Sequence, residues 1–445
     1  MQVSFSEVMG RVPLRMFQIF TFIVCMIVLV ADGVDAQLLG VVTPLILKDY
    51  GVDRGSFGLA VSAALVGFGL GSWGGGWLGD TVGRRWALTL AAVVFSLGTV
   101  AASLAGGVWS MAVLRLIGGL GFGSAYANGI ALTSEWLPDR WRSVAVTTIS
   151  VGTPLGGSIV GALAPTLVAL WGWRGAFVCF GAATFIICVV LIIVVLRDSP
   201  AYLLARGRMA EAKQAARRVV DEDLDLIPER HMTDKAVGVV GVLDRSNLRL
   251  NIGVGLAFTS AALVAYGVLN WMTTLLTSHG FAFAQASYAV FVAGITSIAG
   301  SIAVGLLVQR YGSKLVMTGV GASLLANLVV LAIVIESLAG APDDGERMLI
   351  VALIGLAAAI FSSGVGGMYA MLTHGYPPSC RSAGIGFGIF MGRIGAILSS
   401  AFGGWLLDIG KGSVVPYFGV LCAGAVLLMV GIMINDRHVP PARRA

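Results

Sequence analysis

The chain has 445 residues, of which 57% are hydrophobic and only 12% are charged. A soluble protein of average composition is about 45–50% apolar and about 25% charged, so this composition excludes a large soluble enzyme. The mean hydropathy of +0.90 and the 61 glycines fit helices that pack closely within a lipid bilayer. The sequence therefore predicts an all-α membrane protein that crosses the bilayer many times.

Twelve apolar runs follow one another along the chain, each long enough for a membrane helix of about 20 residues. They lie near residues 16–47, 56–79, 87–105, 109–135, 143–170, 175–196, 249–277, 285–308, 315–338, 347–374, 383–408 and 413–435. The first run has no small-residue cleavage site, so we expect a retained helix rather than a signal peptide. The longest polar stretch predicts a six-helix bundle over 1–196, a cytoplasmic loop over 197–248 and a second six-helix bundle over 249–445.

The basic residues are distributed unequally between the two sides of the membrane. With the N-terminus placed in the cytoplasm, most of the 29 lysines and arginines fall in cytoplasmic segments. Five lie on the opposite side: Lys48, Arg54, Arg174, Arg347 and Lys411. Two lie within the membrane: Arg115 and Arg393. This positive-inside bias predicts a multi-pass protein of the inner membrane with both termini in the cytoplasm. The net charge of +6 is therefore an orientation signal, and we expect no nucleic-acid partner.

The two halves of the chain resemble each other at their loops. Residues 79–85 (Gly-Asp-Thr-Val-Gly-Arg-Arg) follow the second run, and residues 309–314 (Gln-Arg-Tyr-Gly-Ser-Lys) follow the eighth. Leu-Thr begins residues 132–138 after the fourth run and residues 372–377 after the tenth. A repeat of six plus six helices is typical of transporters that bind substrate near the midplane between their halves. The alternative is that short basic loops converge under the positive-inside rule alone.

Two acidic residues interrupt the first apolar run. Asp32 and Asp35 are three residues apart, so their carboxylates share one helix face. Asp32 lies 16 residues past the start of the run, about 24 Å along a helix. A charge inside the membrane is costly and by default marks a proton relay or a substrate pathway. The alternative is a helix that ends near Val30 and leaves both aspartates at the periplasmic surface.

Two arginines also lie within predicted membrane helices. Arg115 is six residues into the fourth run, about 9 Å from the outer face, so an ion pair with one aspartate is sterically plausible. The alternative is an interfacial arginine whose charged head reaches into water. Arg393 is ten residues into the eleventh run, about 15 Å deep, and a guanidinium there suits the carboxylate of an organic anion. The alternative for Arg393 is a structural ion pair with an acid such as Asp408.

Several of these segments resemble known motifs. Residues 76–85 resemble the loop motif between the second and third helices of the major facilitator superfamily, and Arg115, Gly119 and Gly123 match its fourth-helix Arg-x-x-x-Gly-x-x-x-Gly pattern. Within that superfamily, residues 32–35 (Asp-Gly-Val-Asp) and 392–396 (Gly-Arg-Ile-Gly-Ala) resemble the aromatic acid:proton symporter family. Residues 133–135 and 266–271 support the same assignment. The resemblance implies twelve transmembrane helices in two six-helix bundles, the major facilitator fold, and a role for Arg115 in proton coupling.

The chain departs from the pattern of these relatives at three places. Thr81 stands where the loop motif usually has Arg or Lys. Asp198 begins an Asp-Ser-Pro-Ala segment where relatives usually carry Glu-Ser-Pro-Arg, and His374 precedes a Gly-Tyr-Pro segment in an unusual position. These departures leave the roles of Asp198 and His374 open.

The candidate site residues fall into three groups. For proton coupling we expect Asp32, Asp35 and Arg115. For substrate binding we expect Arg393, with Asn270, Tyr266, Trp271, Tyr369 and Phe390 as further lining residues. For gating at the inner loops we expect Asp80, Gly83, Arg84, Arg85, Glu135, Arg142 and Arg381, as conformational latches rather than ligand contacts.

Motifs of enzymes, metal sites and ATP binding are missing from the sequence. The four histidines show no His-Glu-x-x-His spacing, there is no P-loop, and the five cysteines show no paired spacing. We expect no metal and no cofactor. The sequence predicts a monomeric secondary transporter that imports a small carboxylate, of an aromatic, benzoate-like type, together with protons. The alternatives are a symporter for a non-aromatic organic acid, a drug/proton antiporter, and, in a different class, a channel or a transport-dead receptor.

Overall fold

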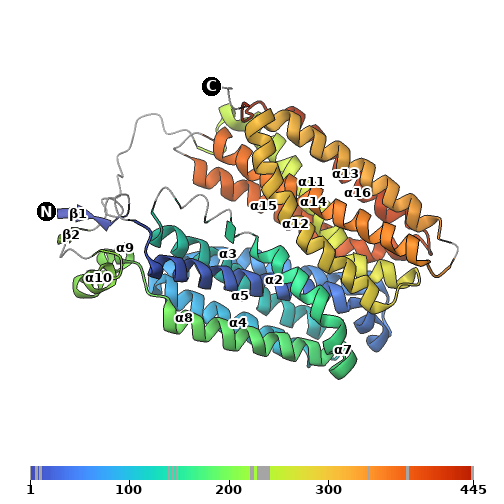
Figure 1. The fold of residues 1–445 in the computed structure, drawn as a ribbon, viewed down its shortest axis with the longest axis horizontal. Helices are drawn as coiled ribbons and strands as arrows, with labels where there is room; N and C mark the ends of the chain where they lie inside the picture. The colour runs from blue at the N-terminus through green and yellow to red at the C-terminus, as the bar shows by residue number, and fades with distance from the viewer. Residues whose placement is uncertain are drawn as a thin grey trace.

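A computed structural model describes residues 2–5, 9, 13–138, 141, 145, 148, 149, 151–220, 225–227, 241–338, 340–376 and 380–441. Within these ranges the chain is almost entirely helical (Figure 1). Eleven described helices are long and apolar enough to cross a membrane. Ten of them are α2 (Met16–Tyr50), α3 (Arg54–Val82), α4 (Arg84–Ala102), α5 (Val108–Trp136), α11 (Leu248–Ser278), α12 (Phe283–Tyr311), α13 (Ser313–Glu336), α14 (Asp344–Gly375), α15 (Arg381–Ile409) and α16 (Val415–Ile434).

The remaining membrane helix makes two crossings. It joins α7 (Gly152–Thr184), a π-helical turn (Phe185–Val189) and α8 (Val190–Val195) into 44 residues. At 1.5 Å per residue this would be about 66 Å of straight helix, twice the roughly 30 Å hydrocarbon core. Gly172 has a non-helical backbone with φ 67° and ψ −179°, a conformation that favours glycine, and it divides the helix. The described chain thus has the predicted twelve crossings, and the predicted fold class is confirmed.

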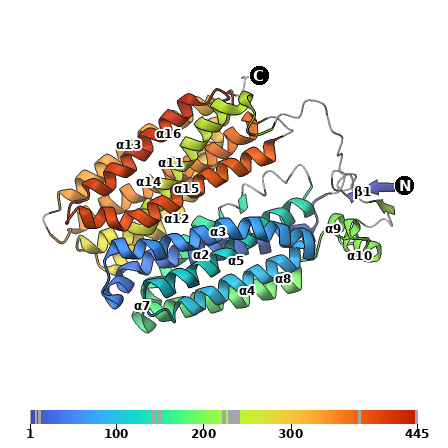
Figure 2. The same cartoon turned by 180° about the vertical axis from the view of Figure 1, so that it is seen from behind.

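The helices gather into two bundles. Figure 1 shows α2 to α8 in one bundle and α11 to α16 in the other, and Figure 2 shows the same division from behind. Four short elements lie at the end that carries the chain termini: β1 (Gln2–Ser4), α9 (Pro200–Ala205), α10 (Met209–Ala216) and β2 (Asp225–Ile227). β1 pairs with β2 in parallel register, Gln2 opposite Asp225. A 3-10 turn (Arg245–Asn247) leads into α11.

The two halves pack against each other at one end of the molecule. One hydrophobic cluster draws buried side chains from both halves, among them Leu38 and Phe57 from the first and Trp271 from the second. The clusters around Trp136 and Tyr376, nearer the termini, each come from one half alone. The bundles diverge toward the termini in both views (Figures 1 and 2). We call the shared end the closed end and the end with the termini the open end.

Glycines on α3 let α5 pack closely against it. This close packing keeps Arg115, which lies on α5, within the bundle. Gly67, Gly71, Gly75 and Gly79 recur every fourth residue on the face of α3 that contacts α5. A Cβ added at Gly67 would overlap the carbonyl oxygen of Leu116, and one added at Gly71 would overlap that of Leu120. Small residues at such crossings let helix backbones approach closely in lipid.

Candidate functional site

A buried ion pair joins α2 to α5. The Arg115 guanidinium donates to both carboxylate oxygens of Asp35, at 2.6 Å to Oδ1 and 2.5 Å to Oδ2. Thr99 on α4 donates its hydroxyl to the same Oδ1 at 2.6 Å. The side chains of Arg115 and Asp35 are only 2% and 5% exposed. Arg115 is therefore not an interfacial arginine that reaches into water. Both carboxylate oxygens of Asp35 accept hydrogen bonds from neighbouring side chains.

Asp32 has a different environment from Asp35, although both lie on α2. It is buried, and its only described hydrogen bond comes from the Thr153 hydroxyl at a long 3.4 Å. No ion pair of Asp32 occurs among the described residues, although the charge of Arg393 lies close enough to act on it. Because α2 runs unbroken from Met16 to Tyr50, a helix end near Val30 is excluded. Asp32 is a buried carboxylate with few donors.

Arg393 lies on α15 and faces the other half of the molecule. Its Nη1 donates to the Tyr266 hydroxyl at 3.1 Å, and its Cζ lies 3.7 Å from the centroid of the Phe68 ring on α3. Within the described residues it has no carboxylate partner. The alternative pairing with Asp408 is wrong, because Asp408 accepts from the Gly55 amide at 2.8 Å and pairs with Arg54. The guanidinium is thus stacked on an aromatic ring and forms no ion pair with a carboxylate among the described residues.

Aromatic rings surround the position of Arg393. Phe68 contacts Tyr126 of α5 at 5.5 Å between ring centroids, and Phe258 of α11 contacts Tyr369 of α14 at 5.4 Å. The hydroxyl groups of Tyr126 and Tyr369 lie close together, which brings the two pairs into one cluster from both halves. Phe68, Tyr126 and Phe258 were not among the residues predicted from the sequence.

One of these three residues carried a signal in the sequence. Tyr126 lies 11 residues after Arg115, three turns along the same helix face. A search for polar or aromatic residues aligned with Arg115 would have found it. Phe68 meets Arg393 only because α3 packs against α15 of the other half, and no local pattern reports that contact.

A small cavity connects the acidic pair to the second half. It holds about 40 Å³ and is lined by Asp32, Asp35, Arg115, Tyr266 and Asn270, together with apolar side chains that include Phe68. A water needs about 10–15 Å³ measured in this way, so the space accommodates two or three waters if enough polar partners are present. The lining residues supply such partners from both halves.

The other predicted lining residues are placed differently from one another. Asn270 reaches this cavity and donates to the Ser400 hydroxyl at 2.7 Å. Trp271 is fully buried and donates its indole N–H to the Ser400 carbonyl at 3.1 Å, so it holds α11 against α15. Phe390 is 63% exposed, on the open-end side of Arg393, and no described contact joins it to the aromatic cluster.

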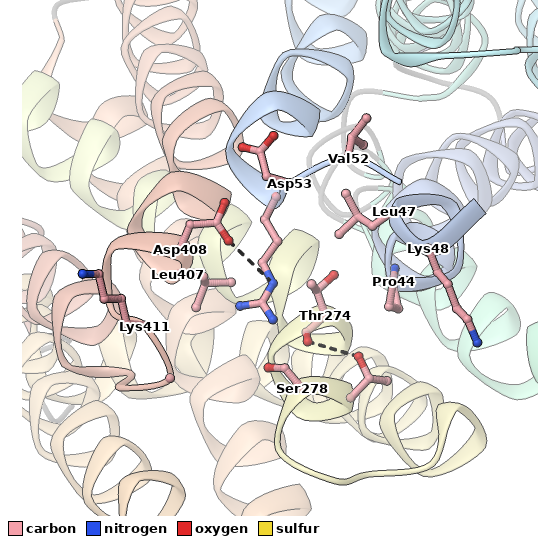
Figure 3. A pocket seen from close by; sticks show the side chains of 13 residues that line it. Pro44, Leu47, Lys48, Val52, Asp53, Thr274, Ser278, Leu407, Asp408 and Lys411 are labelled. Atoms are coloured by element: carbon pink, nitrogen blue, oxygen red, sulfur yellow. Dashed lines mark hydrogen bonds and ion pairs between the residues drawn. The ribbon is translucent and has the colours of Figure 1, made fainter. Parts of the chain in front are cut away.

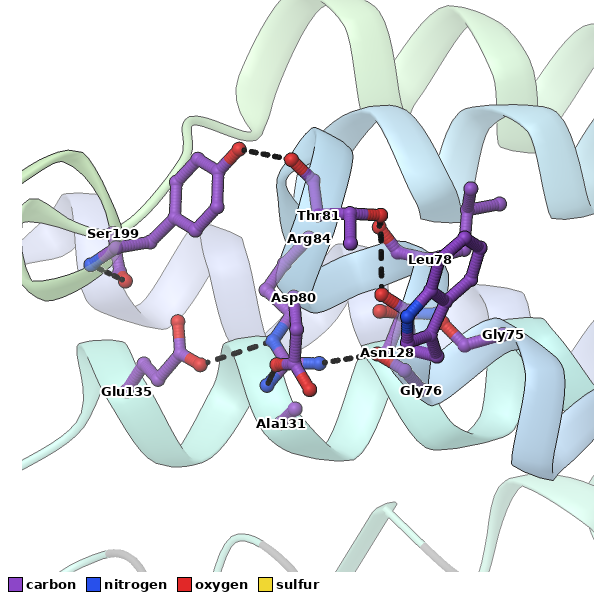
Figure 4. Close-up of polar contacts among 12 residues, drawn as sticks. Gly75, Gly76, Leu78, Asp80, Thr81, Arg84, Asn128, Ala131, Glu135 and Ser199 are labelled. Carbon is purple, nitrogen blue, oxygen red and sulfur yellow. Dashed lines mark hydrogen bonds and ion pairs between the residues drawn. The ribbon is translucent and has the colours of Figure 1, made fainter. Parts of the chain in front are cut away.

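Three of the predicted gating residues, Asp80, Arg84 and Glu135, meet at the loop between α3 and α4 (Figure 4). Arg84 forms an ion pair with Asp80 at 2.5 Å and another with Glu135 of α5 at 3.1 Å. Gly83 has a φ of 105°, which permits the tight turn between the two helices. Arg85 donates its side chain to the Ile193 carbonyl at 2.7 Å. Arg142 lies outside the described residues, as does the side chain of Arg381, whose backbone begins α15.

Asp198, one of the departures from the loop pattern, has a clear structural position. Its Oδ1 accepts from the backbone amide of Arg85 at 2.9 Å, in the first turn of α4. A carboxylate is favourable at a helix N-terminus, where amides are unpaired. Burial raises the pKa of the Asp198 carboxyl, while the Arg85 amide opposes the shift. Asp198 fastens the segment after α8 onto the α3–α4 loop, whereas His374 is exposed.

The sequence profile of the Major Facilitator Superfamily matches residues 25–363 of this chain. The chain belongs to the major facilitator superfamily. The match includes Asp32, Asp35 and Arg115, and it ends before α15 and Arg393. The protein is therefore a multi-pass membrane transporter and not an enzyme.

Relatives of the transporter agree with the predicted resemblance to aromatic acid:proton symporters. It is 28% identical to the 4-hydroxybenzoate transporter of Pseudomonas aeruginosa over 408 residues, which cover 89% of this chain and 88% of that one. It is 28% identical to the gallate transporter of Pseudomonas putida, over 90% and 88% of the two chains. The predicted resemblance is confirmed by these relatives.

Solved structures share the fold of the transporter. The inward open conformation of the xylose transporter of E. coli superposes with a TM-score of 0.75 at 17% identity, over 94% of this chain and 96% of that chain. The crystal structure of the D-xylose-proton symporter gives a TM-score of 0.72 at 17% identity, over 96% and 99%. At this identity the likeness concerns the fold alone.

Proposed function

We propose that the transporter imports an aromatic monocarboxylate of the benzoate type together with protons, by alternating access of one central site. The observation that carries the proposal is Arg393, a cation between the halves that lacks a carboxylate partner among the described residues. A substrate carboxylate supplies that partner through two parallel N–H···O bonds. The proposal places residues 1–196 and 249–445 as the two moving halves of a monomer.

The surroundings of Arg393 favour an aromatic acid over an aliphatic one. Phe68 already offers its ring face to the guanidinium at 3.7 Å, and Tyr126, Tyr369 and Tyr266 add ring surface and hydroxyl groups. Aromatic pairs add about 0.5–1.5 kcal/mol beyond the area that they bury. The names of the relatives, which include 4-hydroxybenzoate, gallate and benzoate transporters, support the same substrate class.

The difference between the two aspartates supports separate roles for them in proton coupling. Asp35 receives three side-chain donor contacts, two of them from Arg115, which fasten the two residues together. Asp32 receives one long contact, and a poorly solvated carboxylate in the membrane is relieved by taking a proton. The small cavity, which Asp32, Asp35 and Arg115 all line, has room for water through which that proton reaches Asp32. In this proposal Asp32 carries the proton and the Asp35–Arg115 pair senses it.

The charge distribution supports an orientation for the two ends. Loops at the open end carry Arg84, Arg85, Arg310 and Lys314, whereas Lys48, Arg54 and Lys411 lie at the closed end. By the positive-inside rule the open end faces the cytoplasm, together with both termini. The described conformation is then open toward the cytoplasm, and the bilayer is the inner membrane.

Uptake of labelled benzoate into proteoliposomes tests the proposed function. With an acidic exterior and a neutral interior, the protein should concentrate benzoate, and collapse of the gradient by a protonophore should stop accumulation. Asp32→Asn should abolish concentrative uptake but retain exchange of benzoate across the membrane, because asparagine resembles the protonated acid. Asp436→Asn, on the exposed tail after α16, is the matched control and should behave as the unaltered protein.

Two results would overturn the proposal. If Asp32→Asn still accumulates benzoate against a gradient, Asp32 does not carry the proton. If the unaltered protein accumulates no aromatic acid under any proton gradient, the symport proposal is wrong. Asp35→Asn is a poorer test, because an unpaired Arg115 costs about 3–5 kcal/mol of stability.

A further inference from the structure

A second, larger cavity opens at the closed end of the molecule (Figure 3). It holds about 500 Å³, within the usual range of small-molecule sites. Its walls come from both halves, at the ends of α2, α11 and α15 and the start of α3. The lining residues used below are Arg54, Lys48, Lys411, Thr274, Asp408 and Leu407.

Arg54 is the central cation of this cavity, and its guanidinium makes only one long ion pair among the described residues. Its one described ion pair joins Nε to Asp408 Oδ1 at 3.9 Å, beyond hydrogen-bond distance. Asp408 uses its other oxygen to accept from the Gly55 amide at 2.8 Å. A guanidinium carries five N–H donors, and no described hydrogen bond occupies those of Arg54. A planar anion is the partner that this fork fits best.

The neighbouring side chains suit the same ligand. Lys48 and Lys411 line the cavity and form no ion pair among the described residues. Lys411 has a φ of 48°, rare for a side chain other than glycine, so the fold holds it in a strained conformation there. Thr274 is 2% exposed, and its hydroxyl has no described partner. Leu407 contributes an apolar wall against which a ring can lie.

We propose that this cavity is a second binding site for an aromatic carboxylate, distinct from the site at Arg393. The site captures the substrate anion on the outer side while the central site is open to the cytoplasm. This inference rests on the proposed substrate class and orientation. Because the anion competes with Asp408 for Arg54, its binding weakens a contact between α3 and α15 that closes the outer end.

Calorimetric titration of benzoate on purified protein in nanodiscs tests this site. The titration uses the Arg393→Ala variant, in which the central guanidinium is absent. A weak site should remain, and raising the salt from about 20 mM to about 200 mM should weaken it severalfold, because its cations are partly exposed. Adding Arg54→Gln and Lys411→Gln should weaken this residual binding by about tenfold or more. Adding Arg347→Gln instead, a cation of the same side that pairs with Asp344, should change nothing.

The outcomes separate this inference from the proposed function. Residual binding that is absent, or that survives Arg54→Gln/Lys411→Gln unchanged, would overturn the second site. Failure of the symport proposal shows itself independently, as absent uptake of benzoate by the unaltered protein in proteoliposomes. Measuring the KM for benzoate separately from the outer and the inner side of the membrane adds a second check. Lys48→Gln/Lys411→Gln should raise the KM for external benzoate about threefold at low salt and leave the KM for internal benzoate unchanged. Equal KM changes on both sides would contradict capture from outside.

Discussion

The two ends of the α3–α15 pair differ sharply, although the same helix faces form both. At the closed end a Cβ added at Gly58 would overlap the carbonyl oxygen of Ala401, so the two backbones touch. Eleven residues along α3, Gly69 lies on the same face and meets no atom within 4 Å. Eleven residues back along α15, Phe390 continues the face of Ala401 and is 63% exposed. The contact is made at one end and is absent at the other.

The open end nevertheless has the residues that a contact would need. Because α3 and α15 are antiparallel, the register that pairs Gly58 with Ala401 also pairs Gly69 with Phe390. A glycine opposite a phenylalanine provides a hollow for the ring, as small residues do at close helix crossings in lipid. We infer that the described structure is one of two arrangements, and that Gly69 receives Phe390 in the other.

Among tests of this comparison between the two ends, the largest effect is expected from a bulky side chain at the closed end. Gly58→Leu should prevent contact with Ala401, whereas Gly69→Leu, its matched control on the same face, leaves the described arrangement untouched. With a cysteine at position 390, a membrane-impermeant maleimide applied to the open end should label the Gly58→Leu protein about tenfold more slowly, because overpacking costs at least about 1.4 kcal/mol. Equal labelling rates in the two variants would contradict the two-state interpretation.

A smaller effect is expected from removing the ring at the open end. Phe390→Ala should lower the maximal rate of benzoate uptake by about threefold to tenfold, because the open end closes less well without its large side chain. Benzoate affinity should stay unchanged if Phe390 acts in closure. A loss of affinity with an unchanged maximal rate would instead place Phe390 in substrate binding, the role that its sequence position suggested.

The smallest effect concerns the tail that docks on the loop between α12 and α13. The Ser313 amide donates to the Val439 carbonyl at 2.9 Å, and the Val439 amide donates to the Ser313 hydroxyl at 2.8 Å. His438 lies beside Ser313. Burial lowers the pKa of His438, so the folded tail favours the neutral imidazole. Its stabilising contribution is therefore present above the unfolded pKa of about 6.5 and declines as the pH falls through that value.

Hydrogen exchange checks this pH dependence. Protection of the Ser313 and Val439 amides should decrease between about pH 8 and pH 5.5 in the unaltered protein and change little in His438→Gln. If protection increases on acidification, the charged imidazole rather than the neutral one stabilises the docked tail.

The fold was predictable from the sequence because hydropathy and charge act locally. Runs of apolar residues predicted the twelve crossings, and the loop motif at residues 76–85 predicted the superfamily. The predicted depth of Asp35 and Arg115 made an ion pair sterically plausible, yet the sequence did not say which aspartate forms it. Residues three apart on a helix differ by about 60° around its axis, and only the position of α4 with Thr99 makes the choice.

The candidate site was less predictable because its contacts cross between the halves. Arg393 was predicted from its depth and from the resemblance of residues 392–396, but Phe68, on which it stacks, belongs to a helix more than 300 residues earlier in the chain. Trp271 was expected near substrate, and the structure buries it in helix packing instead. Such contacts depend on the packing of α3 and α11 against α15, which no local pattern encodes.

The central claim is that Arg393 binds the carboxylate of the substrate. Binding of benzoate and of methyl benzoate, measured on the unaltered protein and on Arg393→Lys, tests it most directly. Lysine keeps the charge but lacks the planar fork, so benzoate should bind about ten- to a hundredfold more weakly to the variant. Methyl benzoate should already bind poorly to the unaltered protein and lose little more on mutation, and the difference isolates the carboxylate–guanidinium contact. If acid and ester lose affinity equally, Arg393 supports the fold rather than the ligand, and the claim is contradicted.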